Sequence, residues 1–177
     1  VLAKDNRVPM LVGTTGLSSD IEQRLSDLSS IAPVLIAPNT SLGVVLLKAL
    51  SKLAQRCLGS SYDVEMLELH HRRKVDSPSG TALSIGKSLA QHGQLEPSFG
   101  RQGKSGPRSN TDLGIHAIRG GGVVGEHTVL FLGNHDRLEL THRAHDRALF
   151  AEGALHAAEW LTRQTPGLYT MEDVIGL

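Results

Sequence analysis

Two adjacent histidines, His70 and His71, are followed by Lys74 and then by the turn-forming run Ser79-Gly80-Thr81. A histidine can give or take a proton near neutral pH, and a lysine can pair with a carboxylate or donate a proton. Taken singly, a histidine is most often structural or solvated, and Ser-Gly-Thr before a helix is most often a cap. Together in one short segment, these residues are typical of a site that binds a dianionic substrate and supplies a proton.

A strand, a turn and a helix are predicted to position these side chains. Residues 62–69 are strand-like and lead into the histidine pair, whose side chains would point to opposite faces if the strand continued through both. A helix is expected from about Gly80 to Gln91 because an apolar pattern recurs there. The start of that helix would offer unpaired N–H groups and the positive end of the helix dipole, which suit a carboxylate or a phosphate.

Two earlier loops are further candidates because each follows a short apolar strand. Residues 9–12 predict a buried strand that ends in Gly13-Thr14-Thr15-Gly16, and residues 34–37 predict a second strand followed by Pro38-Asn39-Thr40. A helix is expected between the strands, and a long helix over 42–58 follows the second loop. Continuous apolar strands alternating with helices are typical of a parallel sheet, and loops at the carboxyl ends of such strands bind ligands.

The rest of the chain predicts an antiparallel sheet and a final helical segment. Residues 92–113 are rich in Gly, Ser, Pro and charge, and we expect a long loop there. Tight connections then separate three strand-like runs, which predict an antiparallel meander: 115–119, 123–132 and 137–143. A helix over 149–161 and a short last helix from about Met171 complete the chain. The sequence therefore predicts an α/β part followed by an α+β part.

Composition limits the classes of function. The chain has 177 residues, 40% of them hydrophobic, and its 18 basic and 18 acidic residues balance. With this balance, the sequence shows no excess of basic residues of the kind that binds nucleic acid or a membrane surface. No stretch reaches the roughly 18 apolar residues of a membrane span. The single cysteine, Cys57, allows no disulfide within the chain, which fits a reducing cytoplasm. Because Cys57 falls in an apolar helical pattern, we expect a buried structural thiol.

Two other patterns are weaker candidates. Gly120–Gly125 fits the spacing G-x-G-x-x-G, but a strand-like run follows where a dinucleotide site needs a helix, so a turn or bulge is favoured. Four histidines lie close in sequence without a Cys pair or an H-x-x-x-H helix, and no metal site is expected from them: His127, His135, His142 and His145. A metal-dependent hydrolase that uses His70 and His71 stays open as an alternative.

The whole run from Glu68 to Ala82, Glu-Leu-His-His-Arg-Arg-Lys-Val-Asp-Ser-Pro-Ser-Gly-Thr-Ala, resembles the signature of the dihydrodipicolinate reductase family. Residues 12–16 are similar to that family's nicotinamide-side loop, and residues 37–43 to its second cofactor loop. Residues 119–128 and 138–147 resemble its sheet strands and return crossover. The resemblance covers essentially the whole chain.

This resemblance implies that NADH or NADPH reduces a cyclic dicarboxylate, 4-hydroxy-tetrahydrodipicolinate, in lysine and diaminopimelate biosynthesis. His70 would be the acid/base residue and Lys74 the second proton donor. The implied substrate-binding residues are His71, Ser79, Gly80 and Thr81. The implied cofactor-binding residues are Gly13, Thr14, Thr15, Ala37, Pro38, Asn39, Thr40 and Arg147.

The resemblance also implies a domain organisation. Residues 1–40 would be a remnant of a Rossmann-like dinucleotide-binding domain, residues 41–148 a mainly antiparallel-sheet domain for substrate binding and oligomerisation, and residues 149–177 a return to the nucleotide domain. A cytoplasmic homotetramer is implied, with no nucleic-acid or membrane partner.

Two features depart from the family pattern. Thr40 stands where the family usually carries a phenylalanine, which would weaken cofactor binding. The glycine-rich G-x-x-G-x-x-G turn that opens the family is not in the sequence, and the chain begins at Val1 without a signal peptide. We expect a fragment that lacks roughly a third of a usual chain, binds NAD(P)H poorly and turns over slowly or not at all. The alternative is a non-catalytic substrate-binding or assembly module of the same family.

Overall fold

A computed structural model describes residues 7–177, which form two compact units. The first unit is the chain up to Val45 together with Arg147–Leu177, and the second is Leu46–Asp146. The first is α/β and the second is α+β, as the sequence predicted. Helix α3 (Leu42–Leu58) begins in the first unit and continues into the second. Among residues 7–177, every helix is too short or too polar to span a lipid bilayer.

The first unit is built on a three-stranded parallel sheet in the order β1-β2-β8. Its strands are β1 (Met10–Val12), β2 (Pro33–Ile36) and β8 (Gly167–Tyr169). Its helices are α2 (Ser19–Ser29), α5 (Ala148–Leu161) and α6 (Met171–Val174). The predicted strands at β1 and β2 are confirmed, whereas β8 was not anticipated from the sequence.

Aliphatic side chains form the core of this unit. Leu35 of β2 and Ala37, which directly follows that strand, pack with Ala157 and Leu161 of α5. Trp160 is partly buried at the edge of this core, and its ring meets that of Tyr169 edge to face at a centroid distance of 5.2 Å. Such edge-to-face pairs add favourable energy beyond the area they bury.

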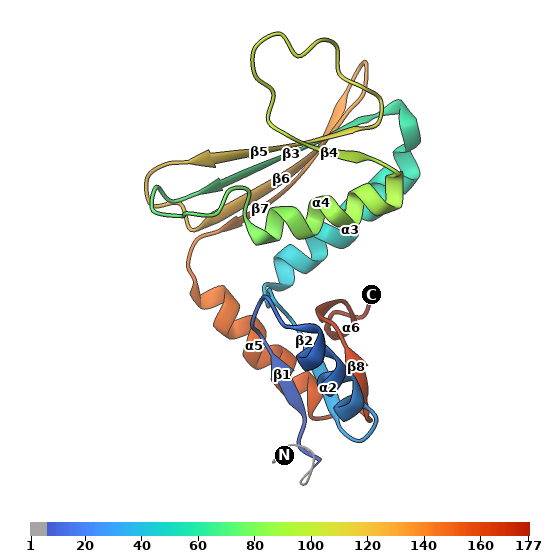
Figure 1. The fold of residues 1–177 in the computed structure, drawn as a ribbon, viewed down its shortest axis with the longest axis vertical. Helices are drawn as coiled ribbons and strands as arrows, with labels where there is room; N and C mark the ends of the chain where they lie inside the picture. Colours follow the sequence, from blue (N-terminus) through green and yellow to red (C-terminus); the bar gives the residue numbers. More distant parts are fainter. Residues whose placement is uncertain (1–6) are drawn as a thin grey trace. The chain divides into compact units, whose positions relative to one another are not determined.

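The second unit holds a five-stranded mixed sheet in the order β4-β5-β3-β6-β7. Its strands are β3 (Asp63–His70), β4 (Glu96–Phe99), β5 (Asp112–Arg119), β6 (Gly125–Leu132) and β7 (Arg137–Ala144). A short 3-10 turn, η1 (Gly59–Ser61), joins α3 to β3. Helix α4 (Gly80–Gly93) and the second part of α3 cover one face of the sheet, as Figure 1 shows.

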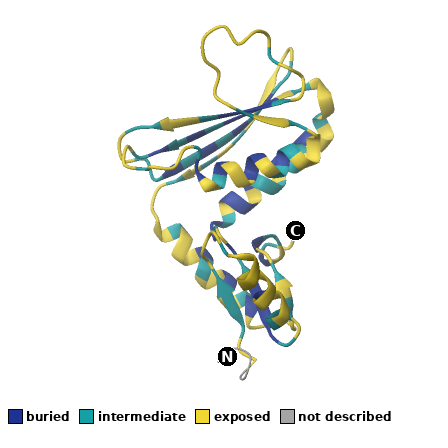
Figure 2. Cartoon of the chain, in the orientation of Figure 1, coloured by how far each residue is buried: buried dark blue, intermediate teal, exposed yellow. Residues whose placement is uncertain are grey.

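Alternation along β3 decides which side chains meet the helices. Val64, Met66, Glu68 and His70 share one face, and all four are buried. That face is the helix-covered one, because Met66 pairs with Ile115, which packs against Gly86 of α4. Figure 2 shows the buried positions concentrated on the central strands and on the helices.

The strand pairing corrects the predicted meander. β5 and β6 follow each other in sequence, but β3 lies between them, parallel to β5 and antiparallel to β6. The chain therefore passes from β3 through α4 and β4 to β5, which runs parallel to β3, and only then enters the antiparallel strands β6 and β7. The predicted long loop over 92–113 also contains the edge strand β4, which pairs in parallel with β5.

The expectation of a buried Cys57 is wrong, because the structure leaves this thiol exposed. Gln55 is buried on the same helix, and two residues further on an α-helix has turned by about 200°. Cys57 therefore lies on the solvent side of α3.

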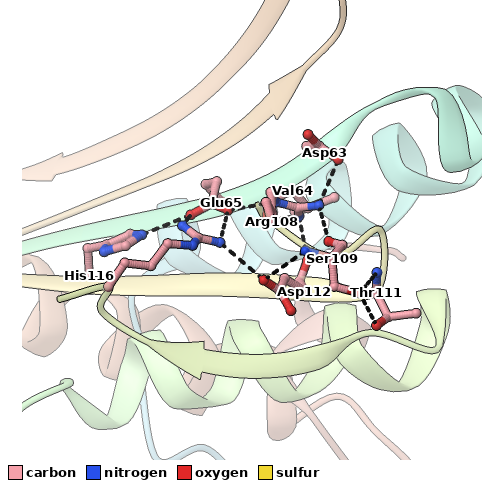
Figure 3. Close-up of polar contacts among 9 residues, drawn as sticks. Asp63, Val64, Glu65, Arg108, Ser109, Thr111, Asp112 and His116 are labelled. Atoms are coloured by element: carbon pink, nitrogen blue, oxygen red, sulfur yellow. Dashed lines mark hydrogen bonds and ion pairs between the residues drawn. The ribbon is translucent and has the colours of Figure 1, made fainter. Parts of the chain in front are cut away.

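The segment between β4 and β5 is tied to the sheet face opposite the helices (Figure 3). Glu65 receives both terminal nitrogens of Arg101, at 2.9 and 2.8 Å, and Nε of Arg108 at 3.0 Å. Nε2 of His116 lies 2.8 Å from the same carboxylate. Burial acts to raise the pKa of Glu65, but the hydrogen bonds from Arg101, His116 and Arg108 outweigh it and lower the pKa to about 2.

Candidate active site

The histidine–lysine segment forms one loop between a strand end and a helix start. β3 ends at His70, and α4 begins at Gly80 with Ser79 as its N-cap. The turn after β5 holds the first part of this loop, because the N–H of Gly120 donates to the carbonyl of His70 at 3.0 Å. The N–H of Arg72 likewise donates to the carbonyl of Gly121 at 3.3 Å. The predicted strand, turn and helix are thus confirmed.

Glu68 lies at the centre of the segment's polar contacts, and its side chain is fully buried. Its Oε2 lies 2.6 Å from Nδ1 of His70, and its Oε1 accepts the N–H of Ser79 at 3.0 Å. Arg119 donates one terminal nitrogen to each oxygen, both at 2.7 Å. Burial acts to raise the pKa of Glu68, but the bonds from Arg119, His70 and Ser79 outweigh it and leave that pKa below its usual value.

Arg119 also connects this carboxylate to the loop. One terminal nitrogen of its guanidinium donates to the backbone carbonyl of Asp76 at 2.7 Å. Asp76 in turn lies 2.8 Å from Nζ of Lys74, and this bond holds the pKa of the Asp76 carboxyl below its usual value. Because one guanidinium contacts both Glu68 and the Asp76 backbone, it fixes the end of β3 and the lysine-bearing loop together.

His127 of β6 packs beside His70 on the buried face. The two rings meet edge to face with centroids 5.2 Å apart. Nε2 of His127 lies 3.1 Å from the hydroxyl of Ser79, which also accepts the N–H of Ala82. Burial, followed by the positive charge that His70 can carry, lowers the pKa of His127 to about 4, so this ring is neutral at pH 7.

Gly125 provides the space for the His70 ring. A Cβ at this position would lie 2.9 Å from Nε2 and 3.3 Å from Cδ2 of His70. Gly125 belongs to the G-x-G-x-x-G run, and β6 begins at this glycine where a dinucleotide site would need a helix. The preference for a turn between strands is confirmed, and close packing against His70 explains the glycine at its end.

The predicted substrate residues therefore fall on one continuous segment of the second unit. His70 and Ser79 are buried and joined through Glu68. The remaining residues of the set follow β3, lie in the loop, or open α4, and range from half-buried to exposed: His71, Lys74, Gly80 and Thr81. The segment thus combines buried polar side chains with a half-buried lysine paired to Asp76 and the first N–H groups of a helix.

The predicted cofactor residues lie in the first unit. β1 and β2 are parallel neighbours, so Gly13–Thr15 and Ala37–Thr40 follow adjacent strands at their carboxyl ends. The N–H of Ala37 donates to the carbonyl of Val12 at 2.9 Å. Thr40 is buried, and its hydroxyl donates to the carbonyl of Phe150 at 2.6 Å. Arg147 is exposed and precedes α5.

Sequence reasoning did not select three residues that shape the site: Glu68, Arg119 and His127. Glu68 had a usable signal, because it falls on the even-numbered, buried side of β3 in an otherwise apolar pattern, and a buried carboxylate needs partners. Arg119 and His127 come from strands β5 and β6, and only the strand pairing brings them to Glu68.

Among residues 7–177, no group of three or more His, Cys, Asp or Glu side chains lies close enough together to hold a metal ion.

Comparisons with known proteins agree on one family. The family model "Dihydrodipicolinate reductase, C-terminus" matches residues 43–175. A 4-hydroxy-tetrahydrodipicolinate reductase of Thiobacillus denitrificans is 47% identical over 96% of this chain and 65% of its own length. One of Akkermansia muciniphila is also 47% identical, over 97% of this chain and 72% of its own length. The chain thus spans about two thirds of the length of these relatives.

A solved structure is similar over nearly the whole chain. The dipicolinate-bound dihydrodipicolinate reductase of Paenisporosarcina sp. TG-14 superposes with a TM-score of 0.80 at 25% sequence identity. The match covers 99% of this chain and 67% of that protein.

Proposed function

Because this chain belongs to the dihydrodipicolinate reductase family, we propose that it provides the substrate site of an NAD(P)H-dependent reductase. The proposed reaction converts 4-hydroxy-tetrahydrodipicolinate into tetrahydrodipicolinate in lysine and diaminopimelate biosynthesis, in the cytoplasm. One observation carries the proposal above the others: His70 is held by a buried carboxylate 2.6 Å from its Nδ1, immediately before a lysine-bearing loop and a helix start.

The chemistry of the reaction accounts for this set of residues. Replacing a carbon–hydroxyl bond by a carbon–hydrogen bond requires that a hydride enters and that the hydroxyl leaves as water after taking up a proton. His70 is proposed as the acid/base residue and Lys74 as the second proton donor. A dicarboxylate also needs partners for its charges. His71, Gly80 and Thr81 are proposed to bind it directly, with Gly80 and Thr81 opening the first turn of α4, whereas Ser79 is proposed to support the site without a direct contact.

Ser79 is buried, and its polar groups contact other residues of the protein. Its N–H and hydroxyl already bond to Glu68, His127 and Ala82. We therefore infer that Ser79 orients the start of α4 and the histidines, and that direct substrate contacts fall on its neighbours.

Bound NADH or NADPH would supply the hydride. The first unit has residues that fit the nicotinamide end of such a cofactor. Gly13, Thr14 and Thr15 are exposed at the carboxyl end of β1, next to the loop Ala37–Thr40 that follows β2. The two loops lie close together, because a Cβ atom built on Gly13 would lie 3.9 Å from the carbonyl oxygen of Ala37. Arg147 is proposed as a further cofactor contact.

A homotetramer is the proposed assembly. The sheet face opposite the helices carries four apolar side chains that remain partly exposed to solvent: Leu67, Leu69, Leu130 and Ile118. Ile118 is 48% exposed. Leu69 and Ile118 are direct partners across β3 and β5. A second copy of this sheet would bury this surface. Sedimentation of the chain, compared with Ile118→Lys, would test it; an unchanged monomer in both would contradict the assembly.

Calorimetric titration with pyridine-2,6-dicarboxylate tests the substrate site. The wild-type chain is expected to bind, and Lys74→Ala and Thr81→Val to weaken binding by about ten-fold or more, the scale of a lost charged contact. Lys87→Ala is the matched control, since Lys87 is an exposed lysine on the later turns of α4. Equal binding by all variants, or none by the wild type, would overturn the proposed site.

Turnover is then measured with NADPH and 4-hydroxy-tetrahydrodipicolinate, both for this chain and for the same chain joined to the nucleotide-binding segment of a relative, which is called the completed enzyme below. Slow or absent turnover is expected from this chain alone, and reduction that saturates with both substrates is expected from the completed enzyme. Dicarboxylate binding without turnover in the completed enzyme would favour a non-catalytic substrate-binding module of the same family.

A further inference from the structure

The contact between His70 and Glu68 defines where the imidazole carries its proton. We propose that Glu68 and Arg119 act as a positioning pair, which fixes the His70 proton on Nδ1 and leaves Nε2 as the atom that exchanges a proton with the substrate. The identity of the substrate rests on the proposed function, whereas the position of the proton rests on the geometry around Glu68.

The first step concerns the acceptor capacity of Glu68. An ionised carboxylate accepts about four hydrogen bonds and donates none. Glu68 receives N–H groups from Arg119 on both oxygens and from Ser79 on Oε1, and these bonds keep it ionised. At the remaining 2.6 Å contact the hydrogen therefore belongs to Nδ1 of His70. Glu68 cannot accommodate the other tautomer without placing two acceptors against each other.

The second step concerns the opposite side of the ring. Among residues 7–177, no hydrogen bond engages Nε2 of His70, and Gly125 leaves the adjoining space without a side chain. His127 does not compete for Nε2, because its own Nε2 is 3.1 Å from the Ser79 hydroxyl and the two rings meet edge to face. Nε2 is thus the ring atom that remains for a ligand.

The third step concerns how the carboxylate itself is held. Arg119 donates one hydrogen bond to each oxygen of Glu68, and this bidentate contact fixes the plane of the carboxylate as well as its position. The same guanidinium donates to the Asp76 carbonyl, next to the Lys74 loop. The orientation of His70 and the position of the lysine-bearing loop therefore depend on one arginine. A histidine oriented by a buried carboxylate in this way commonly depends on it for activity.

The direct test is nitrogen-15 NMR of the histidine side chains in the 177-residue chain, with the His70 signals assigned by their loss in His70→Gln. In the wild type, at a pH where His70 is neutral, Nδ1 is expected to be protonated and Nε2 to be unprotonated. A wild-type His70 protonated mainly on Nε2 would overturn the proposal.

Glu68→Gln supplies the second readout. A glutamine offers one acceptor oxygen and adds two donors, so some of the four N–H groups around position 68 lose their partner. The Nε2-protonated form of His70 is expected to gain population. Glu65→Gln is the matched control, because Glu65 is a buried glutamate of the same strand with arginine partners, on the opposite sheet face. It is expected to leave the His70 signals unchanged.

Kinetics distinguish positioning from a purely structural role. In the reductase assay of the completed enzyme, Glu68→Gln is expected to lower kcat by about 10²-fold, with KM for the dicarboxylate changed by less than about three-fold. An unchanged kcat with an altered tautomer would overturn the link to catalysis. If the completed enzyme shows no turnover but His70 is protonated on Nδ1, the proposed reaction fails while the positioning pair stands.

Discussion

Glu65 and Glu68 lie three residues apart on β3, and their carboxylates point to opposite faces of one sheet, where each is held by arginine nitrogens at 2.7–3.0 Å. Glu68 receives Arg119 from the adjacent strand, on the face that bears the candidate site. Glu65 receives Arg101 and Arg108 from the segment between β4 and β5 (Figure 3). One strand thus anchors the site on one side and a long connecting segment on the other.

Glu65→Ala is expected to destabilise the second unit by about 2 kcal/mol, because Arg101, Arg108 and His116 lose the charged acceptor that they share. The measurement is the free energy of opening of β3 amides by hydrogen exchange. Arg137→Ala is the control, since its pair with Glu139 is exposed and is expected to change stability by less than about 0.5 kcal/mol. Equal effects of the two substitutions would contradict this account.

Acidification is expected to weaken the second unit through His127. Its folded-state pKa is about 4, whereas an unfolded histidine titrates near 6.5. Between these values the unfolded state binds one more proton, so the contribution is complete above about pH 6.5 and is lost as pH falls to about 4, by about 3 kcal/mol at most. Hydrogen exchange from pH 4 to 7 would measure this slope.

The matched pair for this pH prediction is His127→Gln and His135→Gln. The first substitution removes the titrating group and is expected to flatten the dependence in that window. His135 lies exposed in the turn between β6 and β7, and its substitution should leave the slope as in the wild type. An identical slope in all three proteins would assign the acid sensitivity to other groups.

In the completed enzyme, His70→Gln is expected to lower kcat by about 10²-fold or more, which is the usual scale for loss of a general acid. Dicarboxylate affinity measured by calorimetry on the same preparation would separate loss of binding from loss of proton transfer. A kcat equal to that of the wild type would remove His70 from the mechanism.

Gly125→Ala tests the space beside the catalytic candidate. The added methyl group would lie 2.9 Å from Nε2 of His70, so the ring must shift by a few tenths of an ångström, and we expect kcat of the completed enzyme to fall by about ten-fold. Gly122→Ala is the control in the same turn, because nothing lies within 4 Å of its Cβ position. Comparable activity of the two variants would show that the ring tolerates the contact.

Thr40→Val addresses the first unit. The substitution keeps the shape of the side chain but removes the hydroxyl that donates to the Phe150 carbonyl, at an expected cost of about 1 kcal/mol. Opening of α5 amides in hydrogen exchange would report the loss. Thr162→Val removes an exposed hydroxyl that bonds the Glu159 carbonyl, and it should have a smaller effect.

The elements with strong local patterns were predictable from the sequence. The helix over 42–58 and the strand leading to His70 follow from apolar periodicity, and Ser79 caps α4 as a serine before an apolar run should. The same local reasoning missed β4, because Glu96-Pro97-Ser98-Phe99 has weak strand preference. Its proline is compatible with strand structure because β4 lies at the edge of the sheet.

Strand order lay beyond local patterns. Nothing in the β5 and β6 sequences reveals that β3 separates them, so the meander was predicted from their proximity in the chain. The same missing information hid Arg119 and His127, which reach Glu68 only through the β3 pairings. The histidine, lysine and serine candidates are predictable from the sequence because they lie within one short segment.

The chain has one tryptophan, and its place beside Tyr169 has a consequence for optical experiments. Trp160 belongs to the first unit, while Glu65, Glu68 and His127 all belong to the second. Tryptophan emission, excited selectively so that Tyr62 of the second unit does not contribute, therefore reports unfolding of the first unit and is expected to be unchanged by melting of the sheet that carries His70. If the two units unfold at different temperatures, tryptophan emission would show one unfolding transition and circular dichroism would show two.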